Sequence, residues 1–427
     1  MTAHTMALLV GDLVVIAVSA RLLGLLAQRL GQPAVIGEIL GGILFGPTLF
    51  HGAVTHALFP VAVQPTLTNL ANIGIAVFMF FVGLELDHSM LRGQGRIATS
   101  VALGSTLVPF GLGVLLAWHL LGHHPSSRPT AFVLFFGTAM AVTAFPVLAR
   151  ILTGRNLLRT PIGALSVTSA SLADILAWTL LAVVTALAGH NAGLWQLLLI
   201  VPFAAVLLLV VGPLLTRLAA HGDGDRAPGP LLTGRFGALV AVLAGAAGLW
   251  VCAEATQWMG LHLIFGAFLF GVAVPRTRGP LAERVLPWVH RINGWLLLPI
   301  FFMIAGIKVD LSKVDGTALG ELALILLVAV GGKGIGAFAG ARLNGARTRH
   351  SVVLAILANT RGLTELIVLV VGLQLHLLDT PLYSLMVVMA LVTTTMTGIL
   401  LSIVYPESRA RADLAPRIAD PRPEAVP

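Results

Sequence analysis

The chain alternates long apolar runs with short connections that carry its charged residues. A helix needs about 20 consecutive apolar residues to cross a bilayer, and most of these runs reach or approach that length. Thirteen helices are expected, at residues 7–28, 34–50, 66–84, 97–121, 130–152, 162–188, 194–218, 232–255, 260–275, 292–308, 318–342, 351–374 and 382–404. The pattern predicts an all-α polytopic membrane protein in which residues 1–405 form a single membrane unit.

Composition supports the membrane assignment and excludes other classes of protein. Of the 427 residues, 57% are hydrophobic and 10% are charged, whereas a soluble domain carries about 25% charged residues. The single cysteine, Cys252, excludes a disulfide framework and a cysteine-based zinc site. The sequence has no Walker motif, which argues against ATP-driven pumping. We therefore expect a protein without a cofactor and without enzymatic activity.

The basic residues fall almost entirely on alternate connections. The odd-numbered connections and the segment after the last helix hold 20 of the 26 lysines and arginines, while the even-numbered connections hold three. Because cytoplasmic connections collect Lys and Arg, we expect the N-terminus outside the cell membrane and the C-terminus in the cytoplasm. The net charge of +8 then reflects topology rather than nucleic-acid binding. Residues 406–427, rich in Pro and Arg, predict a short, disordered cytoplasmic tail.

Two segments far apart in the sequence resemble each other. Residues 78–87 and 301–310 are both aromatic-rich runs that close on Gly, aliphatic, any residue, aliphatic, Asp. They end the third and the tenth expected helices, and an offset of seven helices reverses the direction in which the second copy crosses the bilayer. Two inverted-topology repeats are the usual architecture of secondary transporters.

Asp174 is the most informative of the ionisable residues that the pattern places inside the bilayer. Each such residue costs about 2.5–3.5 kcal/mol to insert, so each asks for a reason. Asp174 lies in the middle of the expected helix 162–188, near Ser169 and Ser171. One carboxylate that binds either a dehydrated monovalent cation or a proton supplies the minimal chemistry of exchange. A structural carboxylate paired with a nearby base is the alternative.

Three further charges lie at bilayer depth. Lys333 is the lone charge in the interior of the expected helix 318–342, and glycines flank it on both sides. Since glycines allow close helix approach, we expect this helix to pack on helix 162–188 and Lys333 to pair with Asp174. Arg361 and Glu365 are spaced i, i+4 and are expected to neutralise each other, which favours a structural role over a direct role in transport.

Two expected helices carry helix breakers at matching positions of the repeats. Residues 130–152 contain Pro146, which removes a backbone donor and frees the carbonyl of Val142. Residues 351–374 contain the run Ala-Asn-Thr-Arg-Gly at 358–362. Broken helices expose backbone carbonyls and dipole ends at the midplane, where transporters hold their ion.

These residues resemble the second monovalent cation/proton antiporter family, which includes Kef-type potassium efflux systems, bacterial sodium/proton antiporters and plant cation/proton exchangers. The resemblance extends from residue 31 to residue 371. It is carried by GQPAVIGEILGGILFGP, FFVGLELD, AMAVTAFPVLARIL, SASLADILAW, GLHLIFGAFLFGVAVP, PIFFMIAGIKVDL, GGKGIGAFAGARL and LANTRGLTELIVL.

The resemblance implies about thirteen helices in two inverted repeats with two crossed broken helices. It also implies a homodimer built from dimerisation helices and a mobile core of helices near 97–188 and 318–404. By position, Asp174 matches the ion-binding aspartate, Thr143 the threonine of the first break, Lys333 the core lysine and Arg361 the basic residue of the second break. Asp174 and Thr143 are thus the candidate ligands of the cation, with Ser171 and Glu365 as further candidates for the site.

One departure from the family pattern affects the expected function. The residue before the ion-binding aspartate is usually Asp or Asn in the family, and here it is Ala173. We expect a cation/proton exchanger for Na+ or K+, electroneutral because one carboxylate carries one cation or one proton. The alternative is an antiporter fold that exports, or acts on, an organic metabolite or ionophore.

Overall fold

The computed structural model describes residues 3–49, 52–60, 62–85, 95–155, 157, 160–188, 198–221, 234–259, 261–274, 280–312 and 314–406, and among these it contains helices and no strands. The helices of the first half are α1 (Ala3–Arg29), α2 (Ala34–Phe45), α3 (Ala53–Leu58), α4 (Gln64–Glu85), α5 (Gly95–Leu120), α6 (Pro129–Ala141), α7 (Phe145–Gly154) and α8 (Pro161–Ala188). The expected tail, residues 406–427, falls almost wholly outside the described residues.

The second half contains two long helices that each include a short π-helical segment. These segments are Leu207–Val211, between α10 and α11, and Asn293–Leu297, between α14 and α15. The helices of this half are α10 (Ile200–Val206), α11 (Gly212–His221), α12 (Gly234–Trp258), α13 (Leu263–Ala273), α14 (Pro280–Ile292), α15 (Leu298–Ile307), α16 (Gly316–Leu343), α17 (Thr348–Ala358), α18 (Leu363–Gln374) and α19 (Thr380–Val404).

The all-α polytopic architecture is confirmed, whereas the count of thirteen spans is not. Each of the thirteen expected segments overlaps a helix or a pair of helices. Within the described residues, nine helices are long and apolar enough to cross a membrane, or ten if the bent pair α17–α18 forms one span. Two expected spans, 34–50 and 260–275, are shorter than predicted, because α2 has 12 residues and α13 has 11.

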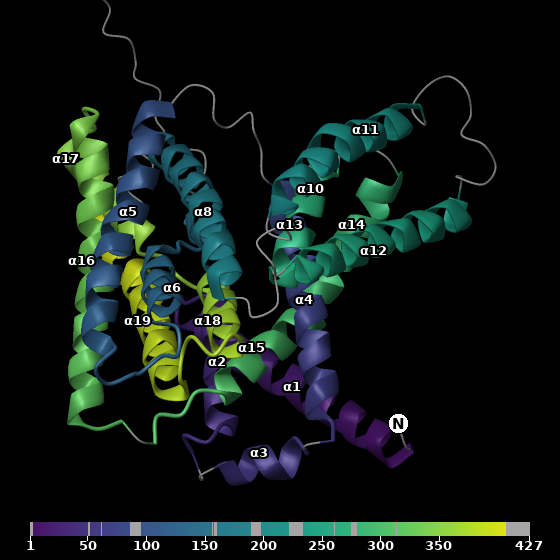
Figure 1. Cartoon of the computed structure of the whole chain (residues 1–427), viewed down its shortest axis with the longest axis horizontal. Helices are drawn as coiled ribbons and strands as arrows, with labels where there is room; N and C mark the ends of the chain where they lie inside the picture. Colours follow the sequence, from purple (N-terminus) through teal and green to yellow (C-terminus); the bar gives the residue numbers. More distant parts are fainter. Residues whose placement is uncertain are drawn as a thin grey trace, which may run out of the picture.

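Helices from both halves of the chain pack around the two helices that are interrupted by a break, α6–α7 and α17–α18. Figure 1 shows α5, α6, α8 and α16–α19 together on one side of the molecule, and α4 with α10–α14 on the other. Contacts join α5 to α6, α8 and α16, and join α16 to α17 and α19. The expected division into dimerisation and core domains stays a prediction.

Among the helices around the two breaks, α5 and α16 approach each other very closely. A Cβ on Gly104 would lie 2.2 Å from the carbonyl oxygen of Gly336, and a Cβ on Gly336 would lie 2.0 Å from that of Gly104. Only glycine allows two backbones to approach so closely. Our expectation that the glycines beside Lys333 face the helix of Asp174 is therefore wrong, because Gly332 and Gly336 face α5.

Candidate functional site

The two helix breaks cross each other and share hydrogen bonds. α6 ends at Ala141 and α7 begins at Phe145, while α17 and α18 meet at a 43° bend between Ala358 and Leu363. The Ala144 amide donates to the Thr360 carbonyl at 3.0 Å, and the Thr364 hydroxyl donates to the Thr143 carbonyl at 3.3 Å. Residues of each break thus form hydrogen bonds with backbone groups that the other break leaves without a helical partner. Inside a membrane such groups need a partner within the protein. Both predicted breaks are confirmed.

The C-terminal end of α6 is held by two positively charged side chains. The last carbonyls of a helix lack partners within it and carry the negative end of its dipole. Arg361 donates to the carbonyls of Ala139 at 2.9 Å and Met140 at 2.6 Å, and Lys333 donates to that of Ala141 at 2.7 Å. Three successive carbonyls of the broken end are therefore satisfied by cations that come from α16 and from the other break.

Lys333 is fully buried and has a second partner in the first break. Its ammonium donates to the Thr143 hydroxyl at 2.6 Å. No ion pair within 4.0 Å joins it to Asp174 among the described residues, so the expected pairing of these two side chains is wrong in this structure. The reason is the orientation of α16: its glycine face turns to α5, which directs Lys333 to the end of α6.

Arg361 and Glu365 form the pair that their spacing predicts. Arg361 Nη1 donates to Glu365 Oε2 at 2.6 Å, and neither side chain is exposed. The Thr394 hydroxyl of α19 also donates to the carbonyl of Arg361 at 2.7 Å. The pair is thus built into the second break and fixes it against α6 and α19.

Asp174 is buried in the middle of α8 without such a partner. It is 5% exposed, and within the described part of the chain neither carboxylate oxygen accepts a hydrogen bond of normal geometry. The nearest favourable groups are the positive charge of Lys333 and the backbone amide of Phe145 at the start of α7. A helix N-terminus favours a negative charge nearby, so the second half of the broken helix stabilises the ionised form.

Ser171 lies close to Asp174 in sequence, but its side chain bonds to its own helix and does not line the cavity at the first break. Its hydroxyl donates to the Val167 carbonyl at 2.9 Å, and the residue is only half-buried. A cavity of about 20 Å³ at the first break is lined instead by Ser166, Ser169 and Ala173 of α8. These positions follow i, i+3, i+7 and share one helix face, which is the signal in the sequence that could have identified them.

The remaining polar residues of this cavity are Thr143 and Ser105. Ser105 comes from α5, and no pattern in the sequence indicates that it meets α8. In the described residues, no group of three or more His, Cys, Asp and Glu side chains could hold a metal ion. The polar groups that line this cavity are therefore hydroxyls, and Lys333 reaches its wall through Thr143.

The model of the transmembrane sodium/hydrogen exchanger family matches residues 14–405 of this chain. The chain belongs to the sodium/hydrogen exchanger family. It is 36% identical over 420 residues to Cation/H(+) antiporter 20 of Arabidopsis thaliana, covering 94% of this chain and 49% of that protein. It is also 36% identical over 417 residues to the Na(+)/H(+) antiporter NhaS4 of Synechocystis, covering 95% of this chain and 99% of that protein.

The chain of this exchanger family member spans about half the length of the plant relatives. The fold matches the sodium proton antiporter MjNhaP1 from Methanocaldococcus jannaschii with a TM-score of 0.64 at 15% identity, covering 96% of this chain and 100% of that one. The predicted family is thereby confirmed, and the chain is a multi-pass membrane protein.

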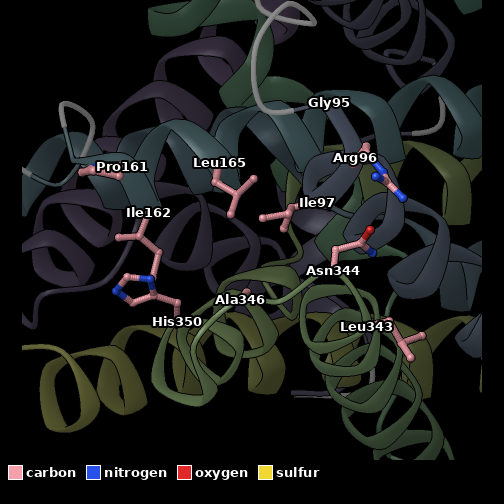
Figure 2. Close-up of a pocket in the computed structure, with 10 residues that line it drawn as sticks. All are labelled: Gly95, Arg96, Ile97, Pro161, Ile162, Leu165, Leu343, Asn344, Ala346 and His350. Atoms are coloured by element: carbon pink, nitrogen blue, oxygen red, sulfur yellow. The ribbon is translucent and has the colours of Figure 1, made fainter.

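A larger cavity of about 750 Å³ lies at one end of the same helices. Figure 2 shows Arg96 and Asn344 directed toward each other at one side of it, with His350 beside Ile162 at the other. Its walls come from the beginnings of α5, α8 and α17 and from the end of α16. These helix ends adjoin the connections whose arginines predict the cytoplasmic side.

Proposed function

We propose that the protein exchanges a monovalent cation, Na+ or K+, for protons by alternating access, with Asp174 as the site that both ions share. The observation that carries the proposal is the buried, unpartnered carboxylate of Asp174 at the crossing of two broken helices. Burying a charged carboxylate without a partner is energetically unfavourable, and binding of either a cation or a proton removes this penalty. Competition for one carboxylate couples the two fluxes.

The surroundings of Asp174 support reversible binding rather than a permanent ion pair. Lys333 is held by the Ala141 carbonyl and the Thr143 hydroxyl, so its charge acts on Asp174 from a distance without blocking it. The start of α7 adds a further positive potential. The positive potentials of Lys333 and of the start of α7 favour the carboxylate over the acid and repel a bound cation. Release of either ion from Asp174 therefore remains possible.

The charges at the crossing favour electroneutral exchange. Lys333 and Arg361 offset Asp174 and Glu365 when all four are ionised, and Ala173 adds no further charge. Since Glu365 is committed to Arg361, one carboxylate remains to carry one cation or one proton. We expect no cation-dependent current on solid-supported membranes, and a current that scales with cation concentration would contradict this stoichiometry.

Export of an organic solute is the alternative that Ala173 leaves open. The space beside Ala173 measures about 20 Å³, which is room for about one water molecule. An organic metabolite needs a pocket of hundreds of cubic ångströms. The space at the first break is therefore too small for an organic metabolite, which favours ion exchange there.

The oligomeric state and the orientation in the membrane complete the proposed function. We propose a homodimer in the cell membrane, with the N-terminus outside and the C-terminus in the cytoplasm, that works without a cofactor. The distribution of arginines supports the orientation. Blue-native electrophoresis and protease protection in sealed vesicles test the dimer and the orientation.

The function is tested in proteoliposomes that carry a pH dye. Additions of Na+, K+ and Li+ should each show whether that cation drives protons across the membrane, and at least one of the first two should do so. Asp174→Asn should remove this movement while expression and assembly persist. Glu254→Gln, an exposed carboxylate of α12, is the matched control and should stay active. Full exchange in Asp174→Asn would refute the role of Asp174.

A further inference from the structure

The two cavities lie in line between the same three helices. Ile97 of α5, Leu165 of α8 and His350 of α17 line the large cavity, which we call the vestibule (Figure 2). Val101, Ser169 and Leu354 of the same helices line the small cavity at the first break, which we call the inner cavity. Each pair of residues is four positions apart, which is one helical turn or about 5.4 Å. The inner cavity is therefore the next level inward from the vestibule.

An apolar constriction separates the two levels. Val101 and Leu354 line the inner cavity on its vestibule side and are each 2% exposed, and both belong to one hydrophobic cluster with Leu165. A constriction one turn thick is thin enough to be wetted by small movements of side chains, as in the hydrophobic gates of channels. On its far side lies Thr143, the hydroxyl that accepts from Lys333.

The hydroxyls of the inner cavity can hold one water molecule. Ser105, Ser166 and Ser169 donate their protons to the carbonyls of Ala102, Ile162 and Leu165, so their oxygens keep lone pairs that can accept. Thr143 accepts from Lys333, and none of the described residues accepts its own proton. A water there would find acceptors and a donor, and a buried water makes about three such bonds.

We propose that the inner cavity binds this water and that the vestibule, the constriction and the water form a proton route to the ion site inside the helix group of α5, α8 and α17. The proposal rests on the proposed exchange and adds a separate path for one of its two ions. A cation is disfavoured in the inner cavity, because the ammonium of Lys333 lies on its Thr143 wall. Protons need only a chain of water and hydroxyl groups.

The transfer balances without a further reactant. A proton enters the vestibule as a hydrated ion and crosses the wetted constriction to the water beside Ala173. That water releases a proton toward Asp174, which follows the lining residue Ala173 on α8, and the carboxylate becomes neutral as its cation leaves. The water is regenerated, and each cycle moves one proton through the route.

Hydration of the inner cavity is tested without a transport assay by X-ray radiolytic footprinting, in which bound water oxidises the side chains next to it. Leu148 and Leu357 line the inner cavity, whereas Leu181 and Leu382 lie in the main apolar core, and all four are at most 1% exposed. We expect the two cavity leucines to be oxidised several-fold faster than the two core leucines. Equal rates would overturn the proposal.

The route itself is tested with Ser169→Val, which fills the inner cavity and removes a hydroxyl. We expect cavity leucines to lose their oxidation and proton-limited turnover to fall by about a hundredfold, as for the loss of a proton-transfer group, while the cation concentration at half-maximal rate stays unchanged. Thr179→Val is the control, since Thr179 is an exposed hydroxyl on the same helix with the same type of backbone bond.

The outcomes separate the route from the exchange function. Oxidised cavity leucines with normal turnover in Ser169→Val would refute the route and leave the exchange intact. A cation affinity that falls in Ser169→Val would mean that the inner cavity holds the cation instead, and would also refute it. Absence of any exchange in the wild-type protein would refute the proposed function, whatever the footprint shows.

Discussion

Two carboxylates are buried at the helix crossing, and they differ in what they contact. Glu365 accepts a hydrogen bond from Arg361 at 2.6 Å, in a pair that is wholly buried. Asp174 is almost as deeply buried, yet neither of its oxygens is paired within the described residues. Glu365 forms an ion pair that stabilises the second break. The charge of Asp174 is not used in such a pair and remains available to a ligand. Burial alone therefore does not distinguish a paired structural acid from the unpaired acid that we propose as the ion site.

The largest effect on stability should come from breaking the buried pair. Arg361→Ala leaves Glu365 charged without a partner and frees the carbonyls of Ala139 and Met140. We expect the free energy of unfolding to fall by about 3–5 kcal/mol, measured as a loss of melting temperature and of monodisperse protein in detergent. The double variant Arg361→Met, Glu365→Met removes both charges and should recover part of this loss. An Arg361→Ala protein as stable as the wild type would contradict the structural role of the pair.

The two carboxylates should respond in opposite ways to the same chemical change. Glu365→Gln loses a charge-assisted hydrogen bond, which costs about 1.5–3 kcal/mol, while Asp174→Asn removes an unpaired buried charge and should leave the melting temperature equal or higher. Both variants are measured side by side in one detergent without added cation. A destabilised Asp174→Asn would show that Asp174 supports the fold and would remove the distinction between the two acids.

A second acid beside Asp174 should change the charge that each cycle moves. Ala173→Asp places a carboxylate at the wall of the inner cavity, next to the Thr143 hydroxyl that holds Lys333. We expect this variant to carry a cation-dependent current on solid-supported membranes that the wild type lacks. Ala173→Asn is the control of equal size without charge, and a current in both variants would attribute the effect to shape rather than to charge.

The charge of Lys333 should weaken cation binding at Asp174 although the two side chains are not paired. Lys333→Gln keeps an N–H donor for Ala141 and Thr143 and removes only the positive charge. Because a buried charge acts over several ångströms, we expect tighter cation binding by several-fold, and, since the same charge favours the carboxylate over the acid, exchange that begins at a higher pH. The measurements are the cation concentration at half-maximal rate and its pH profile. If neither changes, Lys333 only caps α6.

The sequence predicts the helices, the breaks and the i, i+4 pair because each is a local property. Pro146 and the run 358–362 interrupt a helix wherever it packs, and Arg361 and Glu365 are only four residues apart, which keeps them within reach although Arg361 lies in the break and not on a helix. The partner of Lys333 and the contribution of Ser105 were not predictable, since both depend on how α5 and α16 rotate about their axes. The shortness of α2 and α13 was also missed, because hydropathy does not mark where an apolar helix ends.

The smallest expected effect concerns an ion pair at the predicted outer face, which is the solvated counterpart of the Arg361–Glu365 pair. His124 Nδ1 lies 2.6 Å from Asp379 Oδ2 and its Nε2 lies 3.1 Å from Glu321 Oε2, joining the connection after α5 to α16 and to the start of α19. The hydrogen bond with Asp379 raises the pKa of His124 above 6.5 despite partial burial. Burial alone would raise the pKa of Asp379, but its bonds with His124 and the Leu382 amide outweigh this and lower it below 3.8.

The directions of these shifts fix the pH window of the contact. The contribution of His124 is fully present below pH 6.5 and is lost as pH rises through its raised pKa, while that of Asp379 is present above pH 3.8 and is lost as pH falls through its lowered pKa. Both contributions therefore coincide between these values. We expect His124→Ala to cost about 1 kcal/mol of stability near the middle of this window and less at alkaline pH, measured as melting temperature against pH. His4→Ala, an exposed histidine of α1, is the control, and an equal loss at all pH values would show that His124 stabilises by packing instead of charge.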